Sequence, residues 1–280
     1  MARDLLSPVG ILDDTHGAVA RITAPWVGIL WLFTMPYRFA QAYLAHELIN
    51  LGRKAPEYGG YLERLAWILF ATFVLAVIGR CIYVRACLLS LQSGGRVGRE
   101  AWRVPSVHVI HSIYAGLLLE LLFCTTVWTF FAVPLLALPA GLVYVAATRT
   151  TRPGLFKPLF EILRLMGGLK AVVGLLATFA LALLIAFVNV YVAFRLGLWA
   201  LGALGGDGLT RWEHLLRPVH PMFALMPGEP LTILICVAGA LLIVEPFWLA
   251  SLTVYSQRAQ LRQSGEDLRL RFRLLTGTKG

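Results

Sequence analysis

The feature that most constrains this chain is a series of long apolar runs that recurs from residue 24 to residue 257. A helix needs about 20 consecutive apolar residues to cross the hydrocarbon core of a bilayer, and each run is near or above that length. Only 14% of the 280 residues are charged, whereas an ordinary soluble domain has about 25%. The sequence therefore predicts an all-α integral membrane protein.

We expect about six transmembrane helices. The apolar stretch 107–148 is far too long for one crossing at 1.5 Å per residue, so it predicts a helical hairpin. The turn of this hairpin is expected near residues 129–134, because Pro134 disrupts helix continuity. The other four spans are expected at 24–48, which contains Pro36, and at 65–91, 169–204 and 231–256.

The distribution of lysine and arginine predicts the orientation. With both termini in the cytoplasm, the inside segments carry sixteen of these residues and the outside segments five, which is the bias expected of inner-membrane proteins. This orientation requires an even number of crossings and predicts contact with anionic lipid of the inner leaflet. The expected regions are an amphipathic N-terminal segment (1–23), a six-span domain (24–257) with an outer loop (205–230), and a basic amphipathic cytoplasmic tail (258–280).

Two glutamates are expected within the membrane, where ionisable side chains are costly and indicate function by default. Glu120 and Glu245 both lie close to the middle of a predicted span, and Pro246 frees a backbone carbonyl one turn before it. Three interpretations remain open: an interhelical ion pair, for instance of either glutamate with Arg80, a proton or cation site of a transporter, or a neutral hydrogen-bonded carboxyl group.

The remaining ionisable residues of the spans have structural interpretations. Arg80 and Arg85 are expected to extend towards the cytoplasmic interface, and Arg38 and Arg195 lie within reach of an interface or a partner acid. His108 and His111 share one helical face, but no third metal ligand is evident near them. The four cysteines lie in apolar runs without metal-like spacing, which predicts buried free thiols. We expect no metal site, no cofactor and no nucleic-acid partner, and no motif predicts a catalytic residue.

The C-terminal part combines an apolar helix with a basic tail. Tyr255 is expected to mark the inner membrane interface, and Arg258 and the arginines after it are expected to hold the tail on the leaflet. The acidic pair Glu266 and Asp267 would neutralise neighbouring arginines or receive the basic residues of a partner.

Three stretches carry a resemblance to a known group: LDDTHGAVARITAPWVGILWLFTMPYRF, LALPAGLVYVAATRTTRPGLFKPLFEILRLMGG and EPFWLASLTVYSQRAQLRQSGEDLRLRF. In these stretches the chain resembles uncharacterised bacterial six-span proteins related to the membrane domain of some glycerophosphodiester phosphodiesterases. The soluble phosphodiesterase domain has no counterpart here, so that activity does not carry over. Some relatives accompany MoxR-type ATPases and von Willebrand-type or transglutaminase-like membrane proteins, and the resemblance therefore implies an assembly partner.

These observations lead to one expected function and two alternatives. We expect a non-enzymatic scaffold or assembly subunit of a complex in the bacterial inner membrane, with a protein partner or a second copy as its neighbour. One alternative is a small-solute or lipid transporter that uses Glu120 and Glu245. The other is a membrane-embedded lipid-modifying enzyme.

Overall fold

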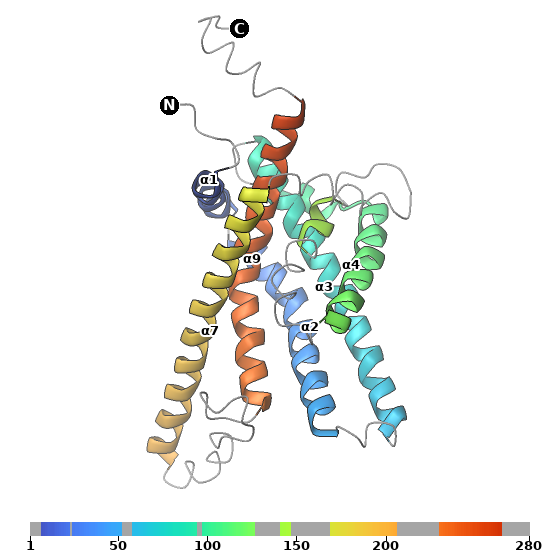
Figure 1. Cartoon of the computed structure of the whole chain (residues 1–280), viewed down its shortest axis with the longest axis vertical. Helices are drawn as coiled ribbons and strands as arrows, with labels where there is room; N and C mark the ends of the chain where they lie inside the picture. The colour runs from blue at the N-terminus through green and yellow to red at the C-terminus, as the bar shows by residue number, and fades with distance from the viewer. Residues whose placement is uncertain are drawn as a thin grey trace, which may run out of the picture. The chain divides into compact units, whose positions relative to one another are not determined.

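The described part of the chain is helical throughout. The computed structural model describes residues 7–22, 24–51, 58–93, 97–126, 141–146, 169–205 and 230–264. Within these ranges there is no strand, which confirms the all-α prediction for the described residues. In Figure 1 the elements are α1 (Pro8–Arg21), α2 (Ala24–Leu51), α3 (Gly59–Ser93), the 3₁₀ helix η2 (Arg99–Trp102), α4 (Ser106–Thr126), α7 (Leu169–Gly205) and α9 (Pro230–Ser264).

Three of these helices are long and apolar enough to cross a membrane, which indicates a membrane protein. They are Gly59–Ser93, Val173–Gly197 and Leu231–Leu261. A fourth candidate arises if α1 and α2 are counted as one bent pair, and Ser106–Leu118 in α4 is a shorter apolar helix. The turn predicted at 129–134 lies outside the described residues.

Contacts divide the chain into two compact units. The first unit comprises Met1–Leu30, Val77–Phe179 and Pro246–Gly280, and the second comprises Trp31–Ala76 and Ala180–Glu245. Four helices, α2, α3, α7 and α9, therefore contribute one part of their length to each unit.

The core of the first unit is packed around α9. A short helical segment at 141–146 is fully buried there, and a Cβ atom at Gly141 would lie 2.2 Å from Leu252 Cδ1. The rings of Phe179 and Trp248 bring α7 against α9 at 4.4 Å between centroids. Burial of such side chains and backbone approach at glycine are what membrane bundles use in place of a hydrophobic driving force.

The helix α1 belongs to the first unit and is amphipathic. Ser7 caps its N-terminus by accepting a hydrogen bond from the Gly10 N–H at 3.2 Å. Its buried side chains recur every three or four residues, as expected of one helical face: Ile11, Thr15 and Ala18. On the exposed side, Asp14 forms an ion pair with Arg258 of α9, whose Nε lies 3.0 Å from Asp14 Oδ2.

The second unit contains the other parts of the four long helices. Tyr37 of α2 meets Phe73 of α3 edge to face at 5.5 Å, and Gly239 of α9 allows Val190 of α7 to approach. Large apolar side chains are exposed on the outer faces of this unit, Trp67 and Ile68 of α3 among them. Such faces suit a lipid environment, since hydrocarbon solvates them without cost.

Candidate functional site

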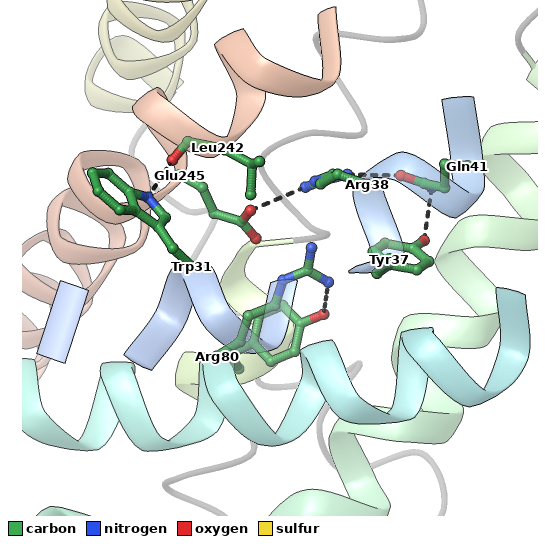
Figure 2. Close-up of polar contacts among 8 residues, drawn as sticks. Trp31, Tyr37, Arg38, Gln41, Arg80, Leu242 and Glu245 are labelled. Atoms are coloured by element: carbon green, nitrogen blue, oxygen red, sulfur yellow. Dashed lines mark hydrogen bonds and ion pairs between the residues drawn. The ribbon is translucent and has the colours of Figure 1, made fainter. Parts of the chain in front are cut away.

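The candidate site of the second unit is an ion pair between α2 and α9. Figure 2 shows the Glu245 carboxylate pointing towards the guanidinium group of Arg38, and the distance between Arg38 Nη2 and Glu245 Oε2 is 3.5 Å. The side chains are 17% and 7% exposed, respectively, so both charges are largely removed from solvent. Because Glu245 lies at the centre of the apolar helix Leu231–Leu261, the pair lies deep within that segment.

Arg38 is held in place by two further residues of its own helix, Gln41 and Tyr37. Its Nη1 donates a hydrogen bond to Gln41 Oε1 at 3.0 Å, and Gln41 Nε2 donates to the Tyr37 hydroxyl at 2.7 Å. The guanidinium carbon lies 5.6 Å from the centroid of the Tyr37 ring, within the range of a cation–π contact. Buried Arg38 Nε has no hydrogen-bond partner among the described residues.

A second polar contact crosses between α2 and α9 one turn before Glu245. Pro246 has no N–H, so it cannot donate to the carbonyl of Leu242 as a helical residue would. The Trp31 indole donates to that carbonyl instead, with Nε1 2.7 Å from Leu242 O, as Figure 2 shows. The carbonyl that Pro246 frees is thus satisfied by a side chain of α2.

Both helices of the pair contain a proline near the charged residue. Pro36 lies two positions before Arg38, and Pro246 directly follows Glu245. Proline inside a helix removes a backbone hydrogen bond, and neighbouring side chains are known to satisfy the groups that it frees. The site therefore consists of opposite charges and one freed carbonyl, each held by groups of the protein itself.

Arg80 has an aromatic partner in the first unit. It is 4% exposed, and its Nη1 donates to the Tyr144 hydroxyl at 2.8 Å with the guanidinium 5.3 Å from the ring centroid. A buried tyrosine therefore binds the guanidinium group of Arg80, and the extension of this side chain towards the cytoplasmic interface stays a prediction. In the same unit, Tyr83 donates to the carbonyl of Pro246 at 3.2 Å.

Arg85 and the two histidines lie where α3 leads into α4. Cys81 Sγ of α3 and Ser112 Oγ of α4 are 3.4 Å apart. Because the two helices run antiparallel, the residue four positions after Cys81 lies opposite the residue four positions before Ser112, which places Arg85 opposite His108. Arg85 Nε donates to the backbone carbonyl of Glu100 at 3.2 Å. His108 is buried, and its Nδ1 has no hydrogen-bond partner among the described residues.

The expected tail residues are only partly described. Tyr255 is fully buried in the first unit, and its position at the inner membrane interface stays a prediction. Arg258 pairs with Asp14 of α1 rather than being available to lipid alone. Glu266 and Asp267 lie outside the described residues, and Glu120 lies in α4 with its side chain outside the described part.

Sequence reasoning missed several partners in these contacts. Trp31, Tyr144 and Asp14 were not singled out, and Arg38 was assigned only a general structural role. A signal for Arg38 was present, because Pro36 and Pro246 each mark a helix interruption beside an opposite charge. For Trp31 the only signal was the unfilled carbonyl created by Pro246.

Within the described residues, no three His, Cys, Asp or Glu side chains come together as metal ligands would. Cys81, Cys87 and Cys236 are buried free thiols, while the side chain of Cys124 lies outside the described part. The fold and site define an α-helical membrane protein with a buried interhelical ion pair. No family model, no curated protein and no solved structure matches this chain.

Proposed function

We propose that this protein is a non-enzymatic scaffold or assembly subunit of a complex in the inner membrane of a bacterium, with six spans and both termini in the cytoplasm. The observation that carries the proposal is the Arg38–Glu245 ion pair. The carboxylate that would otherwise mark a proton or cation site already has a fixed cation beside it.

The geometry of the pair suits a structural role. A buried ion pair contributes little net stability, because the cost of desolvation offsets the attraction, but it penalises arrangements in which either charge lacks its partner. At Arg38–Glu245 that penalty would favour one register of α2 against α9. The Trp31 indole on Leu242 adds a second contact that depends on the same register.

The first unit supports the assembly part of the proposal. The ion pair Asp14–Arg258 holds the amphipathic helix α1 against the end of α9, so α1 and the start of the basic tail form one surface. With the proposed orientation, this surface faces the cytoplasm at the level of the headgroups, where the arginines would meet anionic lipid. The resemblance to six-span proteins that accompany ATPases and other membrane proteins suggests a protein partner at the same surface.

A transporter is the second candidate, and one observation favours it. The charged pair lies beside prolines in both α2 and α9, and interrupted helices in corresponding places are typical of substrate sites in transporters. In that mechanism Glu245 would have to exchange Arg38 for a proton or cation during each cycle.

A double-mutant cycle at the ion pair separates the two candidates. Glu245→Met and Arg38→Met each leave one charge buried without its partner, and each should lower the free energy of unfolding by about 3 kcal/mol, measured by thermal or denaturant unfolding in detergent. Arg38→Met combined with Glu245→Met removes both charges at similar volume and should recover most of this loss. Additive costs of the two single changes would show that the pair has no structural role.

The same double variant then tests function. A scaffold that needs only the packed interface keeps its stoichiometric protein partner when the intact protein is purified from native membranes in mild detergent and analysed by mass spectrometry. A transporter loses proton- or cation-coupled flux in proteoliposomes even though the double variant is folded. Flux in the parent protein that disappears in the folded double variant would overturn the scaffold proposal.

A further inference from the structure

The part of α7 in the second unit exposes one continuous face. Six large apolar side chains at spacings of three or four residues lie exposed on the same side of this helix: Leu181, Ile185, Val188, Val192, Leu196 and Trp199. Only 22% of the most apolar window of α7 is buried, compared with 56% for α9. We call this surface the Asn189 face, after the exposed polar residue that lies along its edge, halfway along its length.

Asn189 is exposed at the edge of this apolar face and lies near the middle of the candidate span Val173–Gly197. Its Nδ2 donates one hydrogen bond to the carbonyl of Ile185 in the preceding turn, at 2.9 Å. A carboxamide has two donor hydrogens and two acceptor lone pairs. One N–H and the Oδ1 atom have no partner among the described residues.

Lipid does not satisfy these groups. Moving an amide from water to a medium that cannot form hydrogen bonds costs roughly 4–8 kcal/mol, and the self-bond to Ile185 recovers only part of it. An alanine or leucine at the same position would have no such cost. A polar side chain on an outward apolar face at this depth is what a helix–helix contact within the membrane uses.

We propose that the Asn189 face is the interface of a homodimer in which α7 of two copies meet and their Asn189 side chains hydrogen-bond to each other. A carboxamide carries both a donor and an acceptor, so two copies related by a two-fold axis satisfy each other reciprocally at the same depth. The residues one and two turns later, Ala193 and Gly197, are exposed and small, and nothing lies within 4 Å of a Cβ at Gly197. They leave room for close approach of the second helix.

This proposal does not depend on the scaffold role, since a transporter could use the same dimer. Its tests measure self-association and not partner binding or flux. The homodimer can therefore fail its tests while the proposed function holds, and the proposed function can fail while the homodimer holds.

Cross-linking tests the position of the interface. Ala193→Cys in the full chain keeps Asn189 and, when oxidised in native membranes, should give a disulfide-linked dimer on a non-reducing gel. Ile68→Cys on the exposed face of α3 is the matched control and should remain monomeric, as should the parent chain. Equal cross-linking at both positions, or a dimer from Ile68→Cys alone, would overturn the proposal.

Self-association in bilayers tests the role of the amide. Asn189→Leu should raise the dimer dissociation constant, measured by energy transfer between labelled copies in liposomes, about 3- to 30-fold. Asn189→Gln keeps a carboxamide and should stay close to the parent protein. Thr72→Val removes a similarly back-bonded polar group from α3 and should change nothing. A monomeric parent protein, or an Asn189→Leu variant with an unchanged dissociation constant, would contradict the homodimer.

Discussion

At the scale of single residues, Pro246 determines what surrounds Glu245. Its missing N–H leaves the Leu242 carbonyl without a helical donor, and the Trp31 indole occupies that carbonyl at 2.7 Å. Its own carbonyl accepts from Tyr83 at 3.2 Å. Pro246 therefore leaves the Leu242 carbonyl of α9 free to accept a hydrogen bond from α2. A hydrogen bond between two helices replaces the backbone hydrogen bond that α9 lacks.

This dependence predicts coupling between Trp31 and Pro246. Trp31→Phe keeps most of the ring but loses the donor, and should lower the free energy of unfolding by about 1–2 kcal/mol, because the Leu242 carbonyl is left without a donor within an apolar helix. In a Pro246→Ala background the new backbone N–H can donate to Leu242, so the same change should cost much less. Denaturant unfolding of the four proteins measures this difference. An equal cost in both backgrounds would mean that the indole bond contributes nothing.

Only the α9 residues of the site were predictable from the sequence. Glu245 in an apolar run and the carbonyl freed by Pro246 follow from chemistry local to α9. Their partners do not, because Trp31 lies 211 positions from Leu242 in the chain, and such contacts depend on how helices pack. Several spans carry an arginine, so composition alone could not single out Arg38 as a residue beside Glu245.

At the scale of elements, α1 is attached to α9 by a contact that is partly exposed. Asp14→Asn should lower overall stability by less than about 1 kcal/mol, because exposed ion pairs contribute little. Local opening is more sensitive, so the amides of α1 should exchange with solvent faster in hydrogen–deuterium exchange, while those of α7 stay unchanged. Asp13→Asn is the matched control, since Asp13 is exposed on the same helix. Equal exchange in both variants would show that the Asp14 pair does not hold α1.

The helical segment 141–146 depends on a glycine for its approach to α9. A Cβ at Gly141 would lie 2.2 Å from Leu252 Cδ1 and 3.0 Å from Trp248 Nε1, and both neighbours are buried. Gly141→Ala should therefore cost about 1–3 kcal/mol through overpacking. Gly28→Ala in α2 meets nothing within 4 Å and should be neutral or slightly stabilising. Thermal unfolding in detergent compares the stabilities of the two variants. A Gly141→Ala variant as stable as the parent protein would mean that the Leu252 side chain moves aside at little cost.

The elements themselves were more predictable than their contacts. Runs of about 20 apolar residues predict helices at the places where α2, α3, α7 and α9 lie, because hydrocarbon allows few other backbone structures. The amphipathic pattern of the N-terminal segment corresponds to α1. The burial of Arg80 and Tyr255 was not predictable, because hydropathy places a residue along the membrane normal but does not say which face meets another helix.

At the scale of the whole molecule, the two proposals assign different faces to different tasks. Within the second unit, Arg38 and Glu245 fix α2 against α9, while the Asn189 face of α7 turns away from its own chain. In the first unit, α1 and Arg258 form a polar surface. The proposed homodimer therefore uses residues of the second unit alone, and the proposed partner surface uses residues of the first unit.

The proposed topology predicts which positions a reagent outside the cell can reach. With six spans and both termini inside, cysteines introduced at Arg53 and Arg217 should react with a membrane-impermeant maleimide on intact cells, whereas those at Arg96 and Lys157 should react only after permeabilisation. The physical reason is the bias of sixteen basic residues against five, which opposes moving the segments around Arg96 and Lys157 across the membrane. The parent chain is the background control, since its three described cysteines are buried. Labelling at Lys157 from outside would mean that 107–148 crosses the membrane once and not twice, and the cytoplasmic surface assigned to a partner would then lose one of its basic segments.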